Sequence, residues 1–291
     1  MSERSRTAAQ LLGHPPDARL LIINADDFGM CHAENIATIQ GLAQGAFCSA
    51  TVMVPCPWFE EVVAFARRAP TADLGVHITH TSEWATYKWG PVSDAVPSMV
   101  DAAGYFYSET EAVYARAQLD DVARETRAQI ERALAAGIDV THLDSHMGTM
   151  QLDLRYHSLY VQLAAEYRLP IRMVSRTALR GMGMESVIDL ADRLGVMAPD
   201  HFWYGGPAAV DETPAYWEQM LRNLKPGVTE LYIHAAVDAP EMRAISDAWT
   251  QRDADFRFFT APATRALLRD LGIQPVGYRA LRDLQRRTQS C

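Results

Sequence analysis

The fold and the chemistry of this chain are decided by one stretch, LLIINADDFG at residues 20–29. Its first four side chains are all apolar, which is typical of a strand buried on both faces of a parallel sheet. Asp26 and Asp27 follow where this strand ends, before the flexible Gly29. Two adjacent carboxylates repel each other, and a bound cation would relieve that repulsion. The stretch therefore predicts a buried strand with an acidic site at its carboxyl end, unless one Asp caps the next segment and the other is solvated.

Similar apolar runs recur along the chain, with helix-like segments between them. The other runs predict strands at residues 50–54, 74–78, 140–143, 171–174, within 196–204 and at 231–234. Helical periodicity bounded by Gly or Pro predicts helices over residues 36–42, 59–65, 119–134, 187–194 and 217–224. Strands that alternate with helices indicate an α/β fold. Their number favours an irregular (β/α) barrel with about seven parallel strands.

The pattern indicates one large domain with a short leading arm. A chain of 291 residues is long enough for two average domains, but single α/β barrels commonly reach this length and no linker interrupts the pattern. We therefore expect a flexible N-terminal arm at residues 1–16, through Pro15 and Pro16, and a single barrel domain at residues 17–291.

Composition argues against several classes of partner. A formal net charge of −9 speaks against nucleic acid, because binding to a phosphate backbone needs clustered Lys and Arg. No run of ~18 apolar residues predicts a membrane span, and no apolar stretch near the N-terminus predicts a secretory signal. We therefore expect a cytoplasmic protein without a membrane partner, and a homo-oligomer is compatible with this composition. The four cysteines include no Cys-x-x-Cys pair, so we expect free thiols.

Histidines mark two further strand ends. His77 lies within an otherwise apolar strand, where a lone histidine is more often a hydrogen-bonded core residue than a ligand. The run THLDSH at residues 141–146 places His142, Asp144 and His146 at alternate positions, so that they share one strand face. Three strand ends that each supply Asp or His form a donor set suited to one divalent metal ion, with coordination positions left for water and substrate.

Two other features fit a site at the same end of the barrel. His234 closes the last strand, where it can serve as a core residue or as a proton donor. Residues 79–118 contain no predicted strand, and loops of that length are usually functional. We expect this segment to form one wall of a substrate site through Glu83, Trp84, Tyr87 and Trp89, with aromatic faces that stack on sugar rings. The alternative is that the two tryptophans pack the loop onto the barrel.

The motifs resemble those of the YdjC-like carbohydrate deacetylases, the chitooligosaccharide deacetylase family, which is related in chemistry to the NodB-type polysaccharide deacetylases. The resemblance rests on NADDFG at residues 24–29, LGVH at 74–77, THLDSH at 141–146, LPIR at 169–172 and TELYIH at 229–234. It implies a hydrolase that removes an N-acetyl group from an amino sugar or an oligosaccharide. The sequence departs from the family pattern at residues 147–149 and 235–237, which leaves the exact substrate open.

The same resemblance implies a role for each site residue. The implied metal ligands are Asp27, His77 and His146. Asp26 matches the catalytic base that takes the proton of the attacking water. Arg172 and His234 match residues that assist catalysis, Arg172 by holding Asp26 ionised or binding a substrate oxygen and His234 as proton donor to the departing amine.

Neighbouring residues and the metal itself leave alternatives open. Asp144, with His142, is expected to orient a ligand imidazole without touching the metal. One carboxylate and two imidazoles favour zinc or another transition metal, whereas the family is often described with magnesium, so both Zn²⁺ and Mg²⁺ stay open. Two functions compete with a sugar deacetylase: a metal-dependent amidase acting on a non-sugar amide or a cyclic imide, and a non-catalytic sugar-binding protein. Adjacent Asp26 and Asp27 weigh against the latter, because binding alone needs no base beside a metal ligand.

Overall fold

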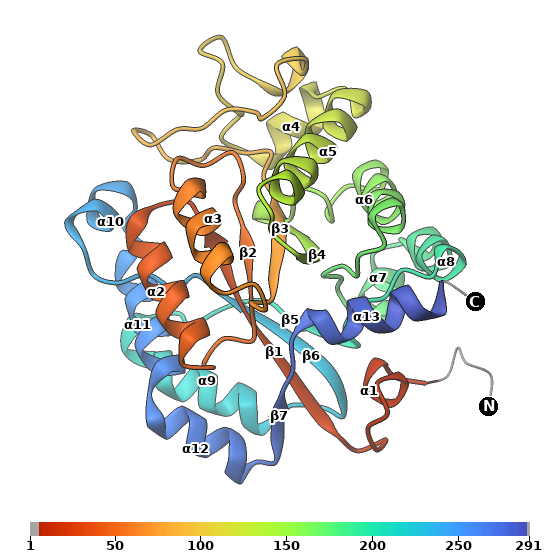
Figure 1. Cartoon of the computed structure of the whole chain (residues 1–291), viewed down its shortest axis with the longest axis vertical. Helices are drawn as coiled ribbons and strands as arrows, with labels where there is room; N and C mark the ends of the chain where they lie inside the picture. The colour runs from red at the N-terminus through yellow and green to blue at the C-terminus, as the bar shows by residue number, and fades with distance from the viewer. Residues whose placement is uncertain (1–5, 290–291) are drawn as a thin grey trace.

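A curved sheet of parallel strands forms the centre of the molecule (Figure 1). The computed structural model describes residues 6–289 of the chain. The strands are β1 (Arg19–Phe28), β2 (Ser49–Val52), β3 (Leu74–Ile78), β4 (Val140–Ser145), β5 (His201–Trp203), β6 (Gly227–Ile233) and β7 (Ile273–Pro275). Their order is β4-β3-β2-β1-β6-β5, with β7 paired to the first residues of β1. The predicted α/β class, with parallel strands in one domain, is confirmed.

The sheet curls into a half-barrel that stays open between β4 and β5. Within residues 6–289 no ladder joins these strands. The backbone at Ile171 lies between them: it bridges Leu143 of β4 and donates to the Met197 carbonyl at 2.9 Å. The strand predicted at residues 171–174 is thus reduced to a single bridge, because Pro170 has no N–H to donate and Ser175 already caps the next helix. The sequence pattern missed β7, which is too short to show an apolar run.

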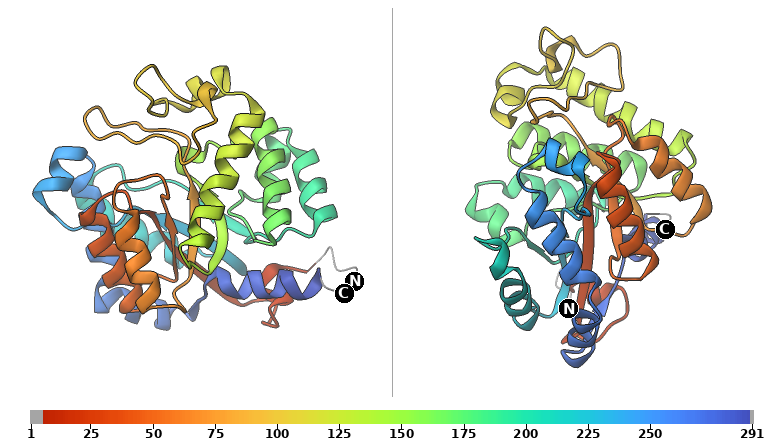
Figure 2. Two further views of the ribbon diagram at one scale, coloured as in Figure 1. Left: turned by 45° about the horizontal axis from the view of Figure 1, so that its top comes forward. Right: turned by 90° about the vertical axis from the view of Figure 1, so that its left-hand side faces the viewer.

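Helices surround the sheet. They are α1 (Ala8–Leu11), α2 (His32–Ala43), α3 (Phe59–Arg68), α4 (Thr110–Arg116), α5 (Leu119–Ala135), α6 (Leu154–Tyr167), α7 (Arg176–Gly181), α8 (Glu185–Leu194), α9 (Thr213–Arg222), α10 (Pro240–Ile245), α11 (Trp249–Thr260), α12 (Pro262–Asp270) and α13 (Tyr278–Thr288), with short 3₁₀ turns η2 (Pro97–Met99), η3 (His146–Gly148) and η4 (Val210–Glu212). Each helix predicted from periodicity overlaps one of these. Figures 1 and 2 show α2, α3 and α9 to α12 on one flank of the sheet and α5, α6 and α8 on the other. None of the described helices has the length and apolar character needed to cross a membrane, and the cytoplasmic location stays a prediction.

Part of the segment expected to be a flexible arm is packed against the sheet. Residues 1–5 lie outside the described part of the chain, whereas Thr7 caps the short helix α1. Ala8 and Ala9 are buried, and the Ala8 N–H donates to the two carboxylate oxygens of Asp200 at 2.8 and 3.1 Å. Residues 8–11 are therefore held by a partner far along the chain, which the N-terminal sequence alone does not reveal.

Strand β1 is buried on both faces and positions the polar residues at its end. Leu21 and Ile23 pack into the main apolar cluster, whereas Leu20 and Ile22 pack into a second cluster on the other face. Strand side chains alternate between the faces, so Asp26 belongs to the face of Leu20 and Ile22. The uninterrupted apolar run therefore forms a doubly buried strand, as predicted, and its carboxyl end carries the candidate site.

Candidate active site

Three side chains from three strand ends converge on one buried point. Asp27 lies near the end of β1, His77 lies in β3, and His146 directly follows β4. Asp27 Oδ1 lies 3.3 Å from His77 Nε2 and 3.3 Å from His146 Nδ1. All three residues are buried, and one donor atom from each lies within 4.8 Å of the others. The structure thus brings together the three side chains that the resemblance implied as metal ligands.

This point has the chemistry that a divalent cation requires. Asp27 Oδ1 is buried and has no hydrogen-bond partner among the described residues, and an unmatched buried carboxylate oxygen is costly. Burial raises the pKa of Asp27, but the three nearby imidazoles and the Arg252 guanidinium outweigh burial and hold that pKa well below its usual range. A charged carboxylate beside two imidazoles suits zinc or a similar metal. The residues present therefore fit one divalent ion.

The backbone at Asp27 explains how two adjacent aspartates reach the same site. Neighbouring strand residues normally point to opposite faces of a sheet. Asp27 adopts a φ of +64° in the left-handed region, and the pairing of β1 with β2 shifts register between Ala25 and Phe28. This irregularity breaks the alternation, so that Asp27 joins the site beside Asp26. A left-handed backbone is costly for a residue with a side chain, and such positions cluster at functional sites.

Two carboxylates hold the outer nitrogens of the converging imidazoles. Asp144 Oδ1 lies 2.7 Å from His77 Nδ1, and Asp144 Oδ2 accepts from Thr51 Oγ1 at 2.8 Å. Burial lowers the pKa of His77, but Asp144 outweighs it and, with further carboxylates, raises that pKa to about 9. Glu83 lies 3.0 and 3.1 Å from His146 Nε2, so it contacts a converging histidine, although the sequence placed it in a substrate wall. Such a partner fixes the tautomer and aims the inner nitrogen at the metal position.

Asp26 is gripped by Arg172 through two parallel hydrogen bonds of 2.7 Å. Arg172 also donates to Glu230 at 2.8 Å and lies 3.0 Å from Asp144. Burial raises the pKa of Asp26, but the charge and hydrogen bonds of Arg172 outweigh burial and lower that pKa to about 2. With the Asn24 amide donating at 2.8 Å, the two oxygens accept three hydrogen bonds and keep room for a fourth. Asp26 is therefore ionised at neutral pH and still able to accept.

Arg252 and Glu34 belong to the site and were missed by the sequence analysis. Arg252 in α11 donates to Asp27 Oδ2 at 2.9 Å and forms a closer ion pair with Glu34 in α2. All three side chains are buried. Because Arg252 occupies Oδ2, it leaves Oδ1 as the oxygen that faces the imidazoles. Arg252 lies 225 residues from Asp27 in the chain, so no spacing rule connects the two.

His234 directly follows β6 and is the most accessible of the predicted catalytic side chains. Its side chain is 36% exposed, against 3% for Asp26 and 5% for Arg172. His234 Nε2 lies 3.8 Å from Asp27 Oδ2. Partial burial, with the nearby charge of Arg252, lowers the pKa of His234 to about 4, so its imidazole is neutral at pH 7. The residue is placed to exchange a proton with a molecule that enters from solvent.

His142 lies apart from the converging side chains. Its Nδ1 lies 2.9 Å from Thr141 Oγ1, and its ring stacks on Tyr278 at 3.7 Å. Its Nε2 has no hydrogen-bond partner within residues 6–289. The strand face that His142 shares with Asp144 therefore extends from the site into the interior, and the supporting role expected for His142 stays a prediction.

Residues 147–149, where the sequence departs from the family pattern, form a tight turn around η3. Met147 and Gly148 both have a positive φ, of 51° and 66°. Thr149 then folds back, and its Oγ1 donates to the His146 carbonyl at 2.9 Å. The three residues that replace the family pattern therefore fix the backbone of His146.

The aromatic residues predicted to form a substrate wall are anchored to the protein. Trp89 is 3% exposed, and its indole N–H donates to the Thr81 carbonyl at 2.7 Å. Trp84 Nε1 lies 3.4 Å from Met30 Sδ, and the Tyr87 hydroxyl donates to the Met30 carbonyl at 2.7 Å. The contacts of Trp84 and Tyr87 fasten the long segment after β3 to Met30, just after β1, whereas Trp89 is held within the segment itself. This is the packing role that the sequence left open.

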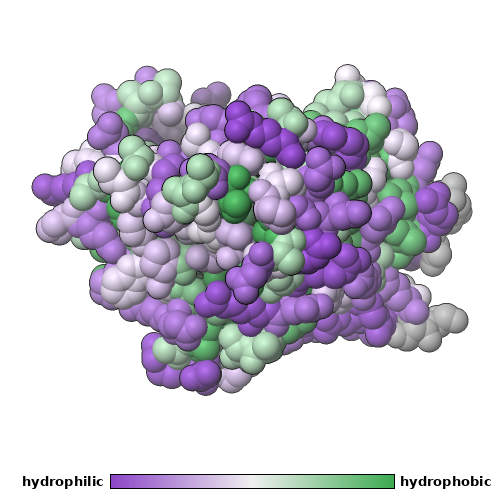
Figure 3. Space-filling model, turned by 90° about the horizontal axis from the view of Figure 1, so that it is seen from above, coloured by the Kyte–Doolittle hydropathy of each residue, from purple (hydrophilic) through white to green (hydrophobic). Residues whose placement is uncertain are grey.

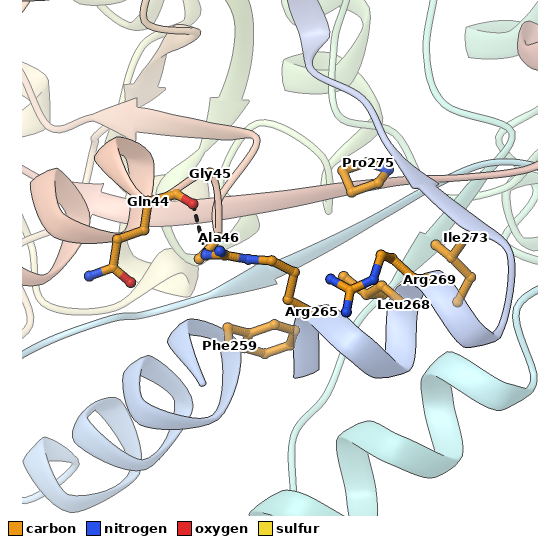
Figure 4. A pocket seen from close by; sticks show the side chains of 9 residues that line it. All are labelled: Gln44, Gly45, Ala46, Phe259, Arg265, Leu268, Arg269, Ile273 and Pro275. Atoms are coloured by element: carbon orange, nitrogen blue, oxygen red, sulfur yellow. Dashed lines mark hydrogen bonds between the residues drawn. The ribbon is translucent and has the colours of Figure 1, made fainter. Parts of the chain in front are cut away.

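Two features of the surface and interior lie outside the converging side chains. The end of the molecule from which the segment after β3 projects is mainly hydrophilic, with apolar side chains in small separate groups (Figure 3). A cavity of about 330 Å³ lies elsewhere, between α12, β7 and the turn after α2 (Figure 4). Its lining includes Arg265, which donates to the Gln44 carbonyl at 2.9 Å, and Arg269, but no carboxylate or imidazole. This cavity is therefore not part of the converging cluster.

Known proteins resemble the chain over most of its length. The model of a family described as YdjC-like protein matches residues 20–270. A carbohydrate deacetylase of Thermus thermophilus is 35% identical over 273 residues, which cover 91% of this chain and 94% of that protein. A carbohydrate deacetylase of Brevibacillus brevis is 29% identical over 264 residues, covering 90% of this chain and 99% of that protein. A solved structure from Enterococcus faecalis, described as a proposed cellobiose-phosphate cleavage protein, superimposes with a TM-score of 0.78 at 28% identity and covers 91% of this chain and 99% of that one.

Proposed function

The chain belongs to the YdjC-like family, and we propose that it is a carbohydrate deacetylase that hydrolyses the N-acetyl group of an amino sugar or oligosaccharide with one divalent metal ion. The observation that carries the metal dependence is Asp27 Oδ1, a buried oxygen that has no hydrogen-bond donor in the described part of the chain and lies 3.3 Å from both His77 and His146. Amides are poorly reactive, so their hydrolysis gains from a metal beside a general base. Asp26 supplies that base within the same site.

Asp27, His77 and His146 would hold the ion, for which Zn²⁺ and Mg²⁺ are both candidates. When bound, the ion polarises the acetamide carbonyl and lowers the pKa of a water molecule. Asp144 and Glu83 hold the outer nitrogens of the two imidazoles, so that the inner nitrogens are aimed at one place in advance. Arg252 keeps the second oxygen of Asp27 turned away from that place.

Asp26 takes the proton of the attacking water. The grip of Arg172 on both carboxylate oxygens fixes the direction in which the remaining acceptor position points. A carboxylate with a pKa of about 2 is a weak base. Asp26 would therefore need a water molecule whose own pKa is lowered at the neighbouring site formed by Asp27, His77 and His146. General base help of this kind is typically worth ~10²–10⁴ in rate.

His234 returns a proton to the departing amine. Its accessible ring is neutral at pH 7, so it would first take up the proton that Asp26 removed from the water and then donate that proton to the departing amine. One proton leaves the attacking water and one arrives at the amine, so the protons balance without an external acid. The products are acetate and the free amino sugar.

Acetate release from defined substrates tests this proposal. Metal-depleted protein is reloaded with Zn²⁺ or Mg²⁺ and incubated with N-acetylated chitooligosaccharides, with simple amides and with cyclic imides, and acetate and free amine are measured. We expect both products from the sugars, and Asp26→Asn should keep the metal while losing roughly 10²-fold or more in rate. Turnover of non-sugar amides or imides alone would overturn the substrate class. Sugar binding without turnover would identify a non-catalytic sugar-binding protein instead.

A further inference from the structure

A row of aromatic side chains leads away from His234 at the edge of the sheet. The Tyr232 ring meets the His234 ring edge to face at 5.3 Å between centroids. The Phe202 ring stacks on Tyr232 at 5.7 Å, and Tyr204 follows at 6.3 Å from Phe202. We refer to Phe202, Tyr204 and Tyr232 as the aromatic row. It begins beside His234 of the candidate site and ends at the surface.

Strand pairing places the aromatic row on the side of the site. Phe202 in β5 pairs with Glu230 in β6, so continuing this register brings Tyr204 level with Tyr232. Residues two apart share a strand face, so the row lies on the face of Glu230, which Arg172 contacts. Trp203, between Phe202 and Tyr204, is engaged differently, because its indole N–H donates to the Tyr216 hydroxyl of α9 at 3.0 Å.

The inner end of the aromatic row is rigid and connected to the proposed base. The Arg172 guanidinium carbon lies 5.3 Å from the Phe202 centroid and 5.1 Å from the Tyr232 centroid, within the range of cation–π attraction. The same guanidinium grips Asp26. A molecule seated on these rings would therefore be held at a defined position relative to Asp26.

The outer end of the row is open. Tyr204 is 71% exposed, more than any other large apolar or aromatic side chain that is exposed in the described part of the chain. The next residues are glycines, and a Cβ added at Gly206 would meet nothing within 4 Å. A broad ring left this exposed contributes little to packing, yet it continues a row that starts at the site.

We propose that the aromatic row is a stacking subsite for a second sugar residue, next to the one whose acetamide reacts. This inference rests on the proposed function, because that function places the acetamide beside Asp26 and His234. One face of a sugar ring presents C–H groups that pack on an aromatic face, while its hydroxyls remain at the rim. The Tyr204 hydroxyl and the glycine backbone at residues 205–206 supply polar groups at that rim.

Dependence on oligosaccharide length tests the subsite. Acetate release by the metal-loaded protein is measured on N-acetylglucosamine and on its di- and trisaccharide for the wild type, Tyr204→Ala, Tyr204→Phe and the neighbouring control Trp203→Ala. We expect Tyr204→Ala to lower kcat/KM about 2-fold to 10-fold on the di- and trisaccharide alone, the range of one aromatic stacking contact. Tyr204→Phe should restore the preference, and Trp203→Ala should not alter it. An equal loss on all three sugars, or no loss, would overturn the proposal.

A binding measurement separates failure of the subsite from failure of the proposed function. Calorimetric titration with the trisaccharide needs no turnover, and thermal unfolding of each variant confirms that it is folded. If the wild type releases no acetate, a 2-fold to 10-fold weaker trisaccharide affinity of Tyr204→Ala would still support the subsite while the reaction is rejected. Equal affinity of the two proteins, or no binding to the wild type, would overturn the subsite.

Discussion

Asp27, His77 and His146 each offer one atom to the same buried point, so each substitution by Ala would remove one of the three proposed metal ligands. We expect Asp27→Ala, His77→Ala and His146→Ala each to lose bound metal together with acetate release. Titration of the metal-depleted variants with Zn²⁺ measures the loss directly. Full metal stoichiometry in any one of them would remove that residue from the ligand set.

Asp144 contacts the proposed ligand His77, whose outer nitrogen lies 2.7 Å from the Asp144 carboxylate. Replacing it by Asn keeps the shape but removes the charge that steadies the imidazole. We expect Asp144→Asn to weaken metal affinity roughly 10- to 100-fold without abolishing binding, and Glu83→Gln should act in the same direction through His146. Unchanged affinity and rate in Asp144→Asn would leave that residue a structural role only.

Arg252 is a buried cation that pairs with both Asp27 and Glu34, so its removal leaves these buried carboxylates without their cationic partner. We expect Arg252→Met to lower the free energy of unfolding of the metal-free protein by roughly 3–5 kcal/mol, the cost of breaking a buried ion pair from one side. The double variant Glu34→Gln/Arg252→Met should recover part of that loss. Urea unfolding measures both.

The exposed ion pair of Arg243 with Asp238 provides a matched control for this test, because solvent screens it. Arg243→Met should leave the unfolding curve nearly unchanged. If Arg252→Met proved as stable as Arg243→Met, Arg252 would not be needed to neutralise the buried carboxylates.

At the scale of elements, helices α9 and α11 meet around one buried acid. Asp255 in α11 accepts from the Trp217 indole of α9 at 2.7 Å and from Gln251 at 3.0 Å. Burial raises the pKa of Asp255 from 3.8 to about 6. The folded state therefore holds this proton more tightly than the unfolded state does. The stabilisation is fully present below pH ~4 and is lost as the pH rises through about 6.

Asp255→Asn removes this titration and keeps an acceptor for Trp217. We expect the wild type to lose roughly 3 kcal/mol, relative to the variant, between pH 4 and pH 8, since each pKa unit corresponds to about 1.4 kcal/mol. Urea unfolding of both proteins across this pH range measures the difference between their free energies of unfolding. The contributions of all other titrating groups cancel in this difference. Parallel stability profiles would show that Asp255 has a similar pKa in the folded and unfolded chain.

At the scale of the whole molecule, the proposed ligands come from β1, β3 and the end of β4 and meet only when the sheet is formed. A metal ion held this way binds the folded state alone and stabilises it by mass action. Free Zn²⁺ at 100 times its dissociation constant should add about 2.7 kcal/mol to the free energy of unfolding. We expect a higher Tm with metal than with a chelator, and no such difference in Asp27→Ala. A metal-dependent Tm in Asp27→Ala would place the binding elsewhere.

The sequence by itself determined the features that depend on local periodicity. The run at residues 20–29 predicted a doubly buried strand with an acidic end, and both faces of β1 are buried. Stripes of apolar residues predicted α2, α3, α5, α8 and α9, because a helix must bury one face wherever it packs. The strand ends that supply Asp or His were predicted from their place at the ends of apolar runs, where parallel strands present their carboxyl ends together, whereas the choice of Asp27, His77 and His146 as ligands followed from the family resemblance.

Only the tertiary structure decided which side chains complete the site. Arg252 contacts Asp27 although 225 residues separate them in the chain. Glu83 was expected in the substrate wall, but it contacts His146. Phe202 stacks on Tyr232 through the pairing of β5 with β6, whereas Trp89 is buried by the loop that was expected to display it. The physical reason is the same in each case: these contacts depend on how the sheet curls and how its loops pack, and residue spacing along the chain carries no record of distances across it.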